Sequence, residues 1–177
     1  IDPENEYRPL VDTVGWSYLD VSLNSQERIN PFDLPLGMKD HEEKPWDLLR
    51  SAVINLLWLM NLLLGKLTPE EESLMEKALI TTYSLKWITI EDDNIIGKEI
   101  PIMQDLQNVL DTMEGAKSLV VRMEKYTSGI FAGIFSKRTN VDLKEWLQVF
   151  SVRDLDDILR PTTMYVCLLY TSPSPRD

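Results

Sequence analysis

The sequence predicts an α/β layer that is interrupted by a large all-α helical insertion. Residues 16–23 carry aromatic and β-branched side chains in near alternation, which is typical of a strand, and residues 146–152 predict a second strand. Between these segments, apolar residues recur at helical spacing from residue 47 to residue 126. The charged and polar stretch at 38–44 marks the change from one pattern to the other.

These patterns divide the chain into discontinuous parts. We expect residues 1–36 and 136–169 to form the α/β layer and residues 37–135 to form the helical insertion. Residues 170–177 are rich in Pro and Ser and resemble a translated sequencing adapter. We therefore expect a disordered tail of non-native character there and exclude it from the fold.

The first residues predict the end of a strand and an acidic loop. Pro3 cannot donate to a sheet ladder and biases Asp2 towards extended geometry, so the body of this strand is expected upstream of Ile1. The loop then carries two carboxylates, Glu4 and Glu6. Ligands of open α/β sheets lie outside the carboxyl ends of the strands, which makes these acids site candidates. From spacing alone, a solvated acidic turn is the alternative.

The first helix of the insertion is expected over residues 47–64, with Asp47 as its N-cap. It is the most apolar helix of the chain, and a membrane span is the alternative. A span needs about 20 uninterrupted apolar residues. Arg50, Asn55 and Asn61 interrupt this segment, which favours a buried helix of a globular domain.

The second helix has a clear start signal. Thr68, Pro69 and Glu71 provide an N-cap, a proline at the first helical position and an acid three residues after the cap. This pattern predicts a capping box and a helix over residues 69–83.

The remaining elements follow from shorter patterns. We expect a short helix at 6–13, an extended crossing at 29–36, a linker at 87–100, helices at 101–113 and 116–126, a loop at 127–135, and a helix that begins at Asp154 and that Pro161 would kink or interrupt.

Composition excludes several classes of function. Lys+Arg 18 against Asp+Glu 29 gives a net charge of −11, so the chain as a whole is no nucleic-acid-binding surface, and the basic pair Lys137–Arg138 is too small to indicate one. Cys167 is the one cysteine, which rules out an internal disulfide and suits a reducing cytoplasm. His41 is the one histidine, so we predict no metal site built on histidines.

Four segments carry recognisable motifs: Asp-Pro-Glu-Asn-Glu-Tyr at 2–7, Ile-Asn-Pro-Phe-Asp-Leu at 29–34, Thr-Asn-Val-Asp-Leu at 139–143 and Arg-Pro-Thr-Thr-Met-Tyr-Val at 160–166. In this order they resemble the hexameric motor ATPases of conjugation and type IV secretion, that is, the VirB-four, TraC and TraG-like proteins related to the HerA–FtsK group. The resemblance implies that the chain is an internal piece of a RecA-like P-loop NTPase domain with a large helical insertion.

The resemblance also implies ATP hydrolysis, with ATP and Mg²⁺ as cofactors, in a longer parent protein. The sequence contains no G-x-x-x-x-G-K-[ST], and no Walker B acidic pair follows Val166. We therefore expect both nucleotide-binding signatures to lie outside these residues, and this chain alone to bind no nucleotide and to be inactive. By the same resemblance we expect a hexamer, other secretion or conjugation components as partners, and a cytoplasmic location, peripheral at the inner face of the membrane.

The resemblance assigns roles to individual residues. Glu6 matches the last acid of the family's DPExEY pattern and is our candidate for the carboxylate that orients the attacking water. Asp2 and Glu4 are candidates for holding the loop or a basic group near the nucleotide. Arg138 and Arg153 could reach a phosphate across a subunit boundary, with surface ion pairs as the alternative.

A second class of function remains open. The insertion could be a stand-alone helical interaction module without chemistry, docking on other subunits or secretion components. Trp46, Trp58 and Trp87 fall within it, where core packing or a partner surface is a better explanation than ligand stacking.

Overall fold

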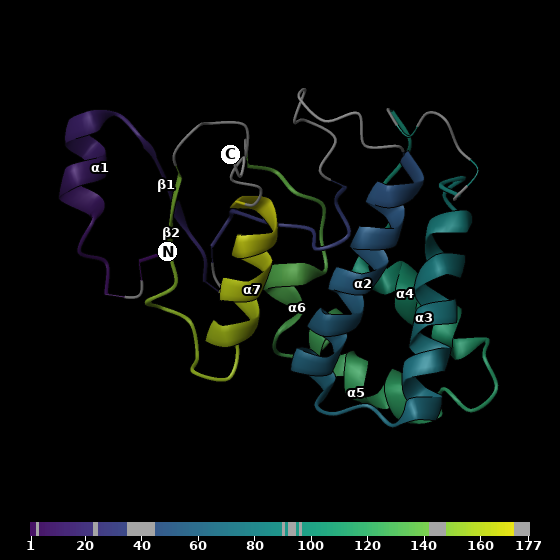
Figure 1. The fold of residues 1–177 in the computed structure, drawn as a ribbon. Helices are drawn as coiled ribbons and strands as arrows, with labels where there is room; N and C mark the ends of the chain where they lie inside the picture. Colours follow the sequence, from purple (N-terminus) through teal and green to yellow (C-terminus); the bar gives the residue numbers. More distant parts are fainter. Residues whose placement is uncertain are drawn as a thin grey trace.

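The computed structural model describes residues 1–2, 4–22, 25–34, 45–89, 91, 95, 97–141 and 148–171. Its elements are α1 (Arg8–Val14), β1 (Ser17–Asp20), α2 (Pro45–Leu64), α3 (Pro69–Ser84), α4 (Met103–Asp111), α5 (Lys117–Thr127), α6 (Ala132–Phe135), β2 (Gln148–Ser151) and α7 (Arg160–Thr171). The strands and α1 lie on one side of the molecule, α2 to α5 on the other, and α6 and α7 between them (Figure 1). The predicted boundary at 38–44, His41 and residues 172–177 of the expected tail fall outside the described residues.

The two predicted strands are present and form a parallel pair. Ser17 pairs with Gln148, and the register continues to Asp20 opposite Ser151. Asp2 forms a further parallel bridge to Ser151, so β2 lies between β1 and the first residues of the chain. This arrangement confirms a mixed fold in which a small parallel sheet accompanies a large helical part.

Helix α2 forms the centre of the helical part. It packs against α3, α5 and α7, and its buried face includes Leu49, Leu56 and Met60. The window Asp47–Leu64 is long and apolar enough to cross a membrane by length and composition, a property that core helices of soluble proteins share. Here 44% of that window is buried inside the molecule, in keeping with the prediction of a packed helix.

Side chains of α5 satisfy the carboxyl end of α2. The Tyr126 hydroxyl donates to the Leu63 carbonyl at 2.6 Å, and Arg122 Nη1 donates to the Leu64 carbonyl at 3.1 Å. Gly65 follows with φ 79°, the left-handed conformation that ends many helices. The last carbonyls of a helix have no partner within it, so these donors stabilise the end of α2.

The predicted capping box of α3 is confirmed. The Glu71 N–H donates to Thr68 Oγ1 at 3.2 Å, and the Thr68 N–H donates to Glu71 Oε2 at 3.1 Å. The Thr68 N–H has the largest effect on the pKa of Glu71 and lowers it. Burial raises this pKa, but Thr68 and Arg122 together hold it below its ordinary value of 4.5.

Several predicted boundaries are wrong. Asp47 lies in the first turn of α2 rather than at its cap, because the helix already begins at Pro45. The expected loop at 127–135 contains α6. Asp154 begins no helix: turns precede α7, and Pro161 is the second residue of that helix, where a missing N–H costs no hydrogen bond.

A buried polar contact joins the α/β part to the helical part. Asn30 is fully buried, and its side-chain amide donates to the Pro101 carbonyl at 2.8 Å and to Asp33 Oδ1 at 3.2 Å. The Asn30 N–H donates to Thr139 Oγ1 at 2.7 Å. Two of the segments that carry the family resemblance, 29–34 and 139–143, therefore meet at this point.

A second contact reinforces the same junction. The hydroxyl of the buried Tyr83, on α3, donates to the Phe32 carbonyl at 2.7 Å. Burial, and then the nearby charge of Asp33, raise the pKa of Tyr83, so its hydroxyl stays protonated and remains a donor.

Candidate functional site

The carboxyl ends of three parallel segments lie side by side. Asp2 and Asp20 both pair with Ser151, the last residue of the central strand β2. The chain leaves the sheet from this edge three times, into the loop before α1, into the loop after β1 and into the turns before α7. Ligands of parallel α/β sheets bind at such an edge, which makes it the candidate site.

Asp2 organises the first of these loops. It is 1% exposed, and its two carboxylate oxygens accept different N–H groups, from Glu6 to Oδ1 at 3.1 Å and from Tyr7 to Oδ2 at 3.0 Å. Burial alone would raise the pKa of Asp2, but the N–H groups of Tyr7, Glu6, Glu4 and Asn5 together lower it. Asp2 is therefore an ionised anchor beneath the loop.

Tyr18 of β1 provides a second attachment for the loop. Its hydroxyl lies 3.4 Å from Asp2 Oδ2 and also donates to Asn5 Oδ1. The guanidinium of Arg8 lies 5.2 Å from the centroid of the Tyr18 ring, a cation–π contact that packs the start of α1 against the sheet. Asn5 has φ 62°, a left-handed conformation that Asn tolerates better than most residues.

Glu4 and Glu6 are presented to solvent above this anchor. Both side chains are exposed, whereas the Glu6 N–H is tied to Asp2. An exposed carboxylate on a fixed backbone can accept a proton from a water or a hydroxyl held next to it. The structure therefore brings three of the predicted site residues, Asp2, Glu4 and Glu6, onto one loop.

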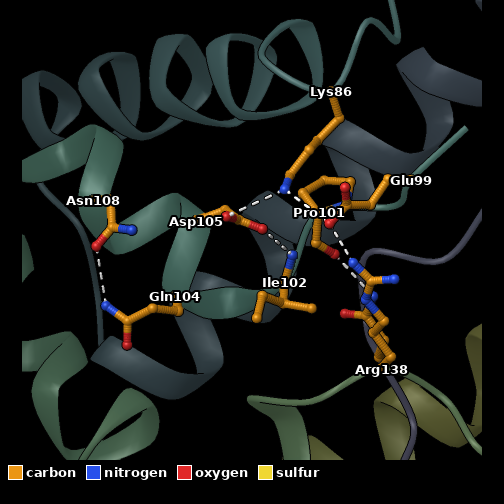
Figure 2. Close-up of polar contacts among 9 residues, drawn as sticks. Lys86, Glu99, Pro101, Ile102, Gln104, Asp105, Asn108 and Arg138 are labelled. Atoms are coloured by element: carbon orange, nitrogen blue, oxygen red, sulfur yellow. Dashed lines mark hydrogen bonds and ion pairs between the residues drawn. The ribbon is translucent and has the colours of Figure 1, made fainter.

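Arg138 is elsewhere. Its guanidinium pairs with Glu99, which also binds Lys86 Nζ at 3.1 Å, and Lys86 lies 3.6 Å from Asp105 (Figure 2). The Arg138 side chain is 65% exposed. These partners belong to the helical part, at the C-terminal end of α3 and the N-terminal end of α4, so the structure does not place Arg138 with the acidic loop.

Three further charged residues lie at the carboxyl edge of the sheet: Arg153, which the sequence analysis named, and Asp20 and Glu27, which it did not. Arg153 follows β2 by two residues and is exposed, so it lies at the same edge as the acidic loop. Asp20, the last residue of β1, and Glu27, in the loop that follows, form an acid pair that the sequence patterns did not indicate. Asp20 Oδ1 and Glu27 Oε2 are buried without a hydrogen-bond partner in the described part of the chain. Burial raises the pKa of Glu27; the backbone N–H of Asp20 partly offsets this rise, and the charge of Asp20 adds to it. The available signal for Asp20 was an acid within the predicted strand at 16–23, since β1 ends at that residue.

Other kinds of site find little support in the described ranges. No group of three or more His, Cys, Asp or Glu lies together there in a way that could hold a metal ion. One pocket of about 60 Å³ lies between the segment at Pro31 and Asp33, α2 and Leu169 of α7, and it has room for little more than water. Burial raises the pKa of the Cys167 thiol to about 12, so it is unreactive.

A solved structure resembles the chain over nearly all of the chain's length. It is described as the structure of VirB4 of Thermoanaerobacter pseudethanolicus, and the match has a TM-score of 0.78 at 22% sequence identity. The match covers 94% of this chain and 65% of the VirB4 chain. No family model and no curated protein matches the sequence. The chain thus has the fold of a segment of VirB4, which confirms, at the level of the fold, the resemblance to the VirB-four group that the four motifs indicated.

Proposed function

We propose that this chain is a segment of an ATP-hydrolysing motor that energises conjugative DNA transfer or type IV secretion. The observation that supports it most is the likeness to VirB4 over 94% of the chain, together with the ordered motifs. In this proposal β1, β2 and the bridge at Asp2 belong to a RecA-like sheet, and residues 37–135 are its helical insertion.

The acidic loop supplies the chemistry of this segment. ATP, Mg²⁺ and a phosphate-binding loop would meet it at the carboxyl edge of the sheet, and the nucleotide with its metal would supply the reacting phosphoryl group. Glu6 orients the attacking water and takes up its proton. Asp2 holds the loop, and Glu4 holds the loop or a basic group near the nucleotide. Arg153 is placed at this edge, whereas Arg138 could reach a phosphate only from a neighbouring subunit and after leaving Glu99.

The surroundings of the motor follow from the same proposal. The longer protein forms an oligomer, a hexamer in keeping with the resemblance, and works with other secretion or conjugation components. It is cytoplasmic or associated with the inner face of the membrane. The transported substrate is outside what these residues specify.

A comparison of this chain with the longer protein tests the proposal. We expect the 177-residue chain alone to show no ATP hydrolysis, because its sequence has no phosphate-binding loop. We expect the reading frame upstream to encode that loop within about 30 residues, and the longer protein to hydrolyse ATP. A reading frame without the loop, or a longer protein without turnover, would reject the motor.

Exposed tryptophans support a second candidate function, protein interaction through the insertion. Trp58 is 63% and Trp87 is 81% exposed, so neither packs in the core; the Trp46 side chain lies outside the described residues. Trp58 continues a stripe on α2 with Ile54 and Leu62, which are also exposed. If the insertion is an interaction module, Trp58→Ser should lower oligomer assembly of the longer protein in sedimentation without changing its thermal unfolding. Unchanged assembly would remove this candidate.

A further inference from the structure

We infer that Asp2 and Tyr18 act together as positioning residues that aim the Glu6 side chain, so that the acidic loop is preorganised by the sheet. This inference rests on the proposed function, since it concerns the residue to which that proposal gives the water-orienting role. The resemblance suggested only that Asp2 holds the loop; the aiming of Glu6 and the part that Tyr18 takes in it go beyond the motifs and the likeness to VirB4.

The first step is that Asp2 itself has a fixed position. The Asp2 N–H donates to the Phe150 carbonyl at 2.7 Å, and the Val152 N–H donates to the Asp2 carbonyl at 3.2 Å. Both backbone groups of Asp2 are therefore bonded to the central strand. The side chain of Asp2 is thus attached to the sheet, and not to the loop whose N–H groups its carboxylate accepts.

The second step is that Asp2 holds the backbone on both sides of one residue. Its Oδ1 accepts the Glu6 N–H, which belongs to the peptide group before the Glu6 Cα, and its Oδ2 accepts the Tyr7 N–H, which belongs to the peptide group after it. Two peptide planes fixed on either side of a Cα determine its φ and ψ. They also determine the direction of its Cα–Cβ bond, so Asp2 sets the direction in which the Glu6 side chain leaves the backbone.

The third step is that Tyr18 holds the anchor and the loop together. Tyr18 stands opposite Val149 in the sheet and reaches across β2 to Asp2 Oδ2 and Asn5 Oδ1. Its hydroxyl also interacts with the side chain of Ser151. The loop is thereby attached to both strands, and a shift of β1 against β2 would move Asn5 and the backbone next to Glu6.

The carboxylate chemistry of Asp2 makes this device testable. A carboxylate accepts with both oxygens, whereas the amide of Asn accepts with one oxygen and carries donors on its nitrogen. In Asp2→Asn one of the two N–H groups, of Glu6 or of Tyr7, must face another donor. The substitution therefore removes half of the attachment at nearly constant size.

The structural part of the inference is tested in the 177-residue chain by amide hydrogen exchange. We expect Asp2→Asn to accelerate exchange at Glu6 and Tyr7 by about 10-fold or more, and Tyr18→Phe to do so more weakly. The control is Asp12→Asn, which removes one exposed acid from α1 and should leave both amides unchanged. Unchanged exchange at Glu6 and Tyr7 in Asp2→Asn would overturn the positioning role, whatever the protein does.

The functional part is tested in the longer protein. We expect Asp2→Asn to lower kcat by about 10-fold or more, as misplacement of a catalytic group does, with KM for ATP unchanged. Because Asp2 acts through Glu6, the double variant Asp2→Asn/Glu6→Gln should be no slower than Glu6→Gln alone. Additive losses, or a raised KM at constant kcat, would contradict positioning. If Asp2→Asn does not fold, Tyr18→Phe is tested in the same way. Unchanged exchange at Glu6 and Tyr7 would reject the positioning role, whereas unchanged turnover in Glu6→Gln would reject the proposed role of Glu6, so the two failures can be told apart.

Discussion

Trp87 stands out among the residues because its backbone and its side chain are both unfavourable for a tryptophan. Its φ is 61°, a left-handed conformation that is rare for bulky residues, and its side chain is 81% exposed. We expect Trp87→Gly to raise the free energy of unfolding by about 1 kcal/mol, the cost of a left-handed conformation for a residue with a Cβ. Urea denaturation of both proteins measures the change.

A matched glycine provides the control. Gly65 has φ 79°, and a Cβ added there would meet no atom within 4 Å, so Gly65→Ala changes the conformational term and little else. This variant should lose about 1 kcal/mol of stability. Stability that falls in both variants would mean that the Trp87 side chain contributes to folding, contrary to its exposure.

At the residue scale, the sequence predicted the contacts of the first loop better than the ion-pair partners of charged side chains such as Arg138. Asp2 was expected to hold the loop or a basic group, and it holds the loop, because an acid just after a strand finds the N–H groups of the following turn. The pairing of Arg138 with Glu99 could not be predicted. It depends on how the end of α3 meets the start of α4, and no local pattern specifies that contact.

At the scale of the element, α3 offers the sharpest test of a local signal. Thr68→Ala removes the acceptor of the Glu71 N–H and should cost about 1 kcal/mol. Thr81→Ala, an exposed position within the same helix, should be neutral or slightly stabilising because Ala is the better helix former. Equal losses in the two variants, measured by thermal unfolding, would show that the capping box contributes nothing.

The same element predicts a dependence on pH. The pKa of Glu71 is lowered in the folded protein, so the folded state favours the charged form. Its contribution to stability is complete above the ordinary pKa of 4.5 and is lost as pH falls from there through the lowered folded value. Asp2, with an ordinary pKa of 3.8, acts in the same direction. Glu71→Gln should flatten the loss of stability between pH 5 and pH 3, which we would follow by denaturation at each pH; an unchanged slope would contradict the assignment.

Helices with explicit end signals were predicted well, and those without them were not. Thr68 with Pro69, and Gly65, specify their boundaries through local hydrogen bonds and backbone geometry. Pro161 was misinterpreted because a proline can either break a helix or begin one, and the preceding turns decide between these outcomes. The start of α7 therefore required the tertiary structure.

At the scale of the whole molecule, the helical part and the α/β part are joined by buried polar contacts. Tyr83→Phe removes the hydroxyl that binds the Phe32 carbonyl and leaves that carbonyl buried without this donor. We expect a loss of about 1–3 kcal/mol. Tyr7→Phe, at an exposed position, is the control and should change little. The two parts should still unfold together in calorimetry; separate transitions in the wild type would mean that the junction does not couple them.

The order of the motifs along the sequence predicted which segments belong to one fold but not how they meet. Asn30 and Thr139 are joined by a hydrogen bond of 2.7 Å, although helices α2 to α6 lie between them in the sequence. Apolar periodicity assigns helices to the insertion, but it carries no information on which carbonyl a buried Asn or Tyr reaches. That part of the account needed the structure.

The most direct test of the account is Glu6→Gln in the longer protein, because the motor proposal places the water-orienting carboxylate there. Asp12→Asn, which changes an exposed acid of α1 outside the acidic loop, is the matched control. ATP affinity and steady-state turnover are measured on the same preparations. We predict unchanged affinity and a fall in turnover of about 100-fold or more for Glu6→Gln, with a small effect for Asp12→Asn. Wild-type turnover in Glu6→Gln would contradict the account.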